Sequence, residues 1–152
     1  MGNKLCAVVE PLRGGLALAL ERALGPGEEV LVCLQGGRGE ALVALADRLL
    51  ILKAGFPSGA WFGWKVKVFP YWGITSVEVG CGALQGRVQV TAAGSVEEQH
   101  GYLESDPLDG YVAAVQAENV VTFPAWKRER FEEAVRVIWS LVEGAKRGAV
   151  AG

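Results

Sequence analysis

The sequence predicts a mainly β protein of the α+β class, in which a curled antiparallel sheet, or partly open barrel, of about seven strands is closed by a C-terminal helix. Short apolar runs separated by glycines and turn residues fill the middle of the chain. No alternation of strand and helix, the pattern typical of a parallel sheet, accompanies them. The C-terminal segment instead carries apolar residues at helical spacing. A chain of 152 residues is long enough to bury one core.

A short helix is predicted ahead of the strands, over residues 12–24. Leu16, Leu20 and Leu24 recur at every fourth position, and the Gly-Pro-Gly that follows is a strong stop signal. The stripe is expected to pack on the domain itself or on a partner subunit, because two arginines are too few for a helix lying on a membrane surface. We therefore divide the chain into an N-terminal helical extension, a main domain and a flexible tail: residues 1–26, 27–143 and 144–152.

The strands follow as short runs rich in β-branched and aromatic residues. The turn at Asp47-Arg48 predicts a hairpin between the second and third of them. In the fourth, Lys65 and Lys67 alternate with apolar residues, which predicts a half-exposed strand. In the sixth, Leu84 begins the inward-facing set that continues with valines. The predicted strands are residues 29–35, 41–46, 49–53, 64–69, 74–79, 84–91 and 119–123.

Two further segments complete the chain. Residues 95–118 are acidic and contain glycine and proline, which predicts a long variable loop. From Pro124, a residue suited to the first turn of a helix, an apolar stripe runs at helical spacing and predicts the closing helix. Its members are Phe131, Ala134, Val135, Ile138, Leu141 and Val142.

Composition excludes several classes of function. A net charge of −2 gives no general attraction to a phosphate backbone, so no nucleic-acid partner is expected. No apolar run is long enough to span a bilayer, and we expect a cytoplasmic protein. The widely spaced cysteines Cys6, Cys33 and Cys81 predict neither a disulfide framework nor a zinc site. No metal or other cofactor is predicted.

Three segments carry a resemblance to a known family. They are Ala46-Asp-Arg-Leu-Leu-Ile-Leu-Lys-Ala-Gly55, Gly63-Trp-Lys-Val-Lys-Val-Phe-Pro-Tyr71 and Ile74-Thr-Ser-Val-Glu-Val79, followed by the glycine-spaced strand that begins at Gly82. Together they resemble the bacterial pleckstrin-homology (PH)-like proteins over residues 27–143. The resemblance implies the PH-like fold, and its motifs are structural rather than catalytic.

Eukaryotic relatives of that fold bind phosphoinositides through clustered basic residues, and this sequence departs from the pattern. The corresponding loop, residues 36–39, holds a single basic residue and is followed by Glu40. Phosphoinositide binding is therefore disfavoured, and any membrane association is expected to be weak. Four residues are candidates for contact with an anion or lipid: Arg38, Lys53, Lys65 and Lys67. We favour the alternative that such lysines solvate a sheet face or protect an edge strand.

Bacterial relatives resemble assembly modules, and the resemblance suggests homo-oligomeric rings. The sequence adds aromatic residues at predicted strand ends and loops, where they either pack the rim of the sheet or anchor a partner. The candidates for an interface are Trp61, Phe62, Trp72 and Trp126.

Three functional hypotheses follow. A non-enzymatic interaction or assembly module, self-associating or bound to a protein partner, is preferred. Weak binding of an anionic lipid or small ligand at a lysine-bearing sheet face is the alternative. An enzyme is disfavoured, because the only histidine, His100, lies in the acidic loop, where nothing indicates a shielded pocket.

Overall fold

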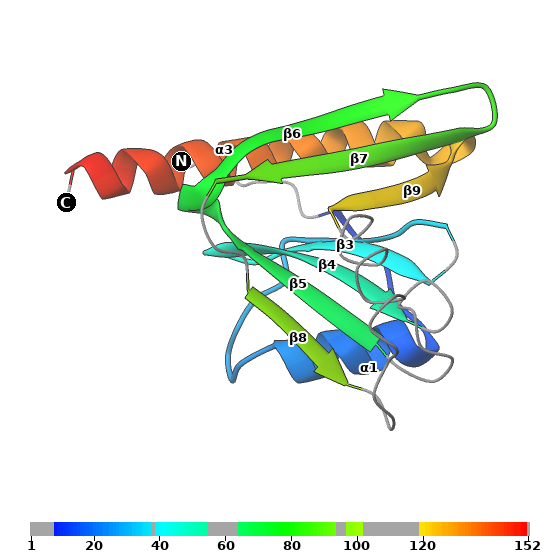
Figure 1. Cartoon of the computed structure of the whole chain (residues 1–152), viewed down its shortest axis with the longest axis horizontal. Helices are drawn as coiled ribbons and strands as arrows, with labels where there is room; N and C mark the ends of the chain where they lie inside the picture. Colours follow the sequence, from blue (N-terminus) through cyan, green and yellow to red (C-terminus); the bar gives the residue numbers. More distant parts are fainter. Residues whose placement is uncertain (1–7, 38, 55–63, 94–96, 102–118, 152) are drawn as a thin grey trace.

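The computed structural model describes residues 8–37, 39–54, 64–93, 97–101 and 119–151, and the described strands form two sheets without a closed barrel (Figure 1). Six strands form the larger sheet in the order β1-β2-β3-β4-β5-β8, and three form the smaller sheet in the order β6-β7-β9. The larger sheet contains β1 (Val8–Val9), β2 (Val32–Gln35), β3 (Glu40–Ala44), β4 (Arg48–Ala54), β5 (Trp64–Pro70) and β8 (Glu97–Gly101). The smaller contains β6 (Ile74–Cys81), β7 (Gln85–Ala92) and β9 (Val120–Pro124).

The elements stack in layers around two cores. Helix α1 (Gly14–Ala23) covers one face of the larger sheet, and the smaller sheet with helix α3 (Arg128–Ala151) lies over the other face (Figure 1). Both faces of the larger sheet are therefore buried over much of its area. The mainly β, α+β class with a C-terminal helix is confirmed.

Helix α1 forms where the leucine spacing predicted it and packs against the protein's own β4 and β5. Leu16 and Ala19 are buried in the core that it shares with the larger sheet. A Cβ at Gly15 would stand 2.9 Å from the Cβ of Ala54, so the helix approaches β4 closely at a residue without a side chain. This packing makes the helix a layer of the fold.

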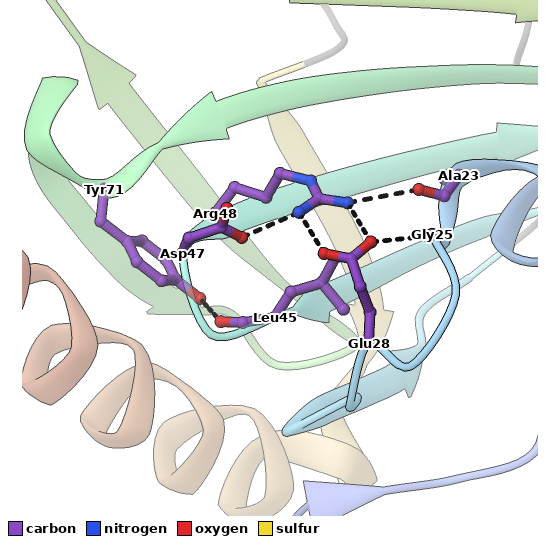
Figure 2. Close-up of polar contacts among 7 residues, drawn as sticks. All are labelled: Ala23, Gly25, Glu28, Leu45, Asp47, Arg48 and Tyr71. Carbon is purple, nitrogen blue, oxygen red and sulfur yellow. Dashed lines mark hydrogen bonds and ion pairs between the residues drawn. The ribbon is translucent and has the colours of Figure 1, made fainter.

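A charge network fixes the turn after α1 to the β3–β4 hairpin (Figure 2). The guanidinium of Arg48 donates to both carboxylate oxygens of Glu28 at 2.6 and 2.7 Å, and the amide of Gly25 donates to the same carboxylate at 2.6 Å. Arg48 also donates to Asp47 and to the carbonyl of Ala23. The hydrogen bonds from Arg48 and Gly25 lower the pKa of Glu28 to about 2.

The closing helix is confirmed, with different ends. After Pro124 the chain makes the 3₁₀ turn η3 (Ala125–Lys127), so α3 begins at Arg128. The predicted stripe is buried or partly buried and stacks Phe131 on Phe123, with ring centroids 4.1 Å apart. The segment after Gly144, predicted as a flexible tail, continues the helix to Ala151.

Two other predictions needed correction, and one strand was missed. Strand β5 is not half-exposed, since α1 covers its apolar face and its lysine face is turned inward. Residues 97–101, assigned to the acidic loop, form β8 and pair with β5; residues 102–118 lie outside the described chain. Strand β1, which pairs in parallel with β2, was not predicted.

None of the described helices is both long and apolar enough to cross a membrane.

Candidate functional site

Lys53, Lys65 and Lys67 lie together on the inner face of the larger sheet, which is the face turned toward the smaller sheet. Lys53 pairs with Lys65 across β4 and β5, and Lys67 lies two residues farther along β5. Their exposed fractions are 4%, 2% and 9%. The pairing of β4 and β5 thus brings the three lysines to one face of the sheet, as the sequence allows if these strands pair. The favoured alternative, that they solvate an open face or an edge, is wrong because β5 lies between β4 and β8 and its inner face is covered.

The best-defined partner of this lysine cluster is Glu40. Its carboxylate lies 2.7 Å from Nζ of Lys53, and both side chains are nearly inaccessible to solvent. The same carboxylate accepts hydrogen bonds from the backbone amide and the hydroxyl of Thr122 on β9. All three lysines take part in polar or electrostatic interactions. The contacts of Glu40 with Lys53 and Thr122 therefore connect the two sheets through a buried ion pair.

The other predicted site residues do not lie together. Arg38, Trp61 and Phe62 lie outside the described residues. Trp72 is 63% exposed in the 3₁₀ turn η2 (Tyr71–Gly73), at the start of β6. Trp126 is 80% exposed in η3, near the far end of that strand. The two tryptophans therefore belong to different surfaces.

A second site, the hairpin end, consists of residues 79–84 together with Trp126. The amide of Gly82 donates to the carbonyl of Gln85 at 2.9 Å, which closes a tight turn with Ala83 and Leu84 at its tip. Leu84 is 88% exposed, and its carbonyl accepts from the amide of Ala125 at 3.2 Å. This bond brings the turn beside Trp126. In Figure 1 the hairpin of β6 and β7 extends past the first turns of α3.

Lys127 holds η3 in place next to Trp126. Its Nζ donates to Glu10 and to the carbonyl of Gln35, both at 2.8 Å, and lies 5.5 Å from the centre of the Trp126 ring. Burial alone would raise the pKa of Glu10, but the hydrogen bond and charge of Lys127, aided by Arg130, outweigh it and lower that pKa. The exposed indole of Trp126 therefore lies beside a lysine that hydrogen bonds hold in place.

Along the outer edge of β6, backbone groups at the hairpin end remain open. The carbonyl of Val77 points to this edge and accepts from Nε1 of Trp139 at 3.1 Å. Because backbone groups alternate in direction along a strand, the amides and carbonyls of Val79 and Cys81 also point to the outer edge, whereas those of Gly80 point to β7. Within the described residues nothing bonds to the edge groups of Val79 and Cys81.

The other edge of the smaller sheet is closed. On β9, Thr122 accepts from the amide of Gly37 at 2.7 Å and donates its own amide to Glu40. A Cβ at Gly36 would lie 2.1 Å from the carbonyl oxygen of Thr122, so glycine is required for this close approach. One edge of the sheet is therefore sealed to the larger sheet, and the other is open at its end.

Leu84 is the main residue of the site that sequence reasoning missed. The alternation placed it inside with Val88 and Val90, which are buried. The signal that could have found it is the position of Gly82, because a tight turn after this glycine places Leu84 at the tip. The open edge of β6 had no local signal, since it depends on where β9 and α3 pack.

The described residues contain no group of three or more His, Cys, Asp or Glu able to hold a metal ion. Cys33 is buried, and desolvation raises the pKa of its thiol to about 11, which keeps it protonated. A shallow recess of about 470 Å³ on the outer face of the hairpin is lined mainly by glycines and by Gln85, Arg87 and Thr122. It holds no arrangement of acid, base and nucleophile.

Comparison of the chain with protein-family models, with curated proteins and with solved structures gave no match.

Proposed function

We propose that this chain is a non-enzymatic assembly module that associates with copies of itself through the hairpin end. The observation that carries the proposal is the exposure of Leu84 and Trp126, at 88% and 80%, on neighbouring turns held together by a backbone hydrogen bond. Large apolar side chains grouped at an exposed, well-ordered position are typical of interaction surfaces. The open backbone edge of β6 lies on the other side of the same turn from Trp126 and adds hydrogen-bonding capacity at this end of the sheet.

Burial of the lysine cluster disfavours the alternative function. A lipid headgroup or small anion bound there would need access to ammonium groups that are nearly inaccessible, and the ammonium of Lys53 is already paired with Glu40. A ligand that displaced Glu40 from Lys53 would leave a buried carboxylate without its charged partner, and the free-energy cost of its desolvation would no longer be offset. The lysines therefore support a structural role.

We also propose that the domain is a divergent PH-like fold. Support comes from the arrangement of β2 to β5 and of β6, β7 and β9 as two antiparallel groups followed by a helix, which is seven strands in all. The added β1, β8 and α1 enlarge the first group and cover its outer face. The proposed assembly function does not depend on this assignment of the fold.

Light scattering after size separation, at protein concentrations from about 1 to 100 μM, tests the assembly function. We expect a mass above that of the 16.1 kDa monomer, increasing with concentration. The double variant Leu84→Ser/Trp126→Ser should shift the chain toward the monomer. Trp72→Ser is the matched control, because it removes an exposed indole from the opposite end of β6 and should leave the mass unchanged. A strictly monomeric protein over the whole range would contradict the proposal.

A further inference from the structure

We infer that two copies of the chain join through their β6 edges, antiparallel, about a two-fold axis at Gly80, so that the two three-stranded sheets become one continuous sheet. The inference rests on the proposed self-association and specifies its geometry. A strand edge paired with its own copy in antiparallel orientation is self-complementary, as a two-fold interface requires.

The open backbone groups determine the register. Val79 and Cys81 direct their amides and carbonyls outward, whereas the carbonyl of Val77 is already bound by Trp139. Pairing Val79 with Cys81 of the second copy, and Cys81 with its Val79, satisfies all four open groups on each strand. Moving the axis to Val79 would bring the occupied Val77 into the ladder, and moving it to Cys81 would bring in the turn. Only the axis at Gly80 uses the open groups and no others.

Gly80 suits the position on the axis. In this register the two copies of Gly80 face each other as a non-hydrogen-bonded pair, at which opposite Cα atoms are about 4.5 Å apart. Its missing side chain leaves open space, since a Cβ there would meet nothing within 4 Å. The segment from Val77 to Cys81 contains neither proline, lysine nor a bulge, the devices that usually block pairing at an exposed edge.

Charge complementarity on the outer face also favours a second copy. Arg87 is paired with Gly80, so its side chain can cross the axis without obstruction. The Cα atom of Glu78 in the other copy then lies about 12 Å from the Cα atom of Arg87, because the two residues are separated by two strand spacings across the sheet and two residues along it. The two side chains together can span this distance. Neither residue forms an ion pair within its own described chain. The two-fold axis produces this Arg–Glu contact twice.

Disulfide cross-linking tests the register. Gly80→Cys is introduced into a Cys6→Ser/Cys81→Ser background, which leaves only the buried Cys33. Two thiols on the axis meet the Cα separation of a disulfide, about 4.4–6.8 Å, so mild oxidation should give a covalent dimer. Glu78→Cys in the same background is the control. Its two copies would be about 14 Å apart along the strands and should not cross-link.

A charge exchange provides a second readout. Glu78→Arg and Arg87→Glu should each weaken dimerisation by roughly tenfold, because each places like charges opposite one another. The double exchange should restore the affinity. If light scattering shows oligomers while Gly80→Cys cross-links no better than Glu78→Cys, the register is wrong and the assembly function stands. If the unmodified chain is monomeric at every concentration, both proposals fail.

Discussion

Glu40 is the residue on which most of the internal polar structure depends. It receives the ammonium of Lys53 and two hydrogen bonds from Thr122, and its exposed fraction is 7%. A charge removed from water in this way is tolerated only when its partners are complete. The carboxylate therefore couples the stability of both sheets.

Replacing Glu40 by Gln should destabilise the protein by about 3 kcal/mol, near the lower end of the cost of breaking a buried ion pair, because the amide still accepts from Thr122. Thr122→Val, which removes only a hydroxyl, is the control and should cost about 1 kcal/mol. Urea denaturation measures both. Equal losses for the two variants would show that the Lys53–Glu40 pair adds nothing beyond a neutral hydrogen bond.

Glu28 gives a pH-dependent prediction. Because the folded-state pKa is lowered to about 2, the contribution of the Glu28–Arg48 pair is complete above the ordinary value of 4.5 and decreases as the pH falls toward 2. The melting temperature of Glu28→Gln should lie below that of the unmodified chain from pH 5 to 8, and the gap should close between pH 4.5 and 2. The exposed neighbour Glu29→Gln provides the comparison. A gap that is constant down to pH 2 would contradict the assignment.

At the scale of elements, α1 stabilises the larger sheet from outside. Leu16 is 3% exposed in the core beneath the helix, whereas Leu18, two residues later, is 42% exposed. Leu16→Ala should therefore cost about 2–5 kcal/mol, and Leu18→Ala less than about 0.5 kcal/mol, in urea denaturation. Similar effects of the two substitutions would mean that the helix does not pack through its Leu16 face.

The elements that sequence predicted well are those whose pattern has one structural solution. The leucine repeat around Leu16 and the stripe from Phe131 can only be buried helix faces, and the runs of β6, β7 and β9 end at turn residues. The alternation at Lys65 and Lys67 has two solutions, an open face or a covered inner face, and the choice depends on what packs against the sheet. Strand β8 was hidden by its polar composition, and β1 by its two-residue length. The hairpin end was predicted only through Trp126, because exposure and open edges arise from packing.

At the scale of the whole molecule, an assembled state links stability to concentration. If copies pair through β6, the melting temperature should rise as the protein concentration is raised from about 1 to 100 μM, because dissociation accompanies unfolding. Cys81→Pro should remove this dependence, since it deletes an outward amide that serves no bond within the described chain. Cys81→Ser, which keeps the amide, should preserve it. A melting temperature that does not vary with concentration in the unmodified chain would contradict the dimer.

The contact between Glu40 and Thr122 spans 82 residues of sequence, and that between Glu10 and Lys127 spans 117. Neither can form until the chain has been synthesised past Thr122 and Lys127, so the larger sheet leaves the ribosome with Lys53 and Glu40 awaiting the β9 edge. High sequence separation of this kind slows folding. The two sheets are consequently joined only after β9 has been synthesised, and a chain released before Asn119 would lack the strand that joins its halves.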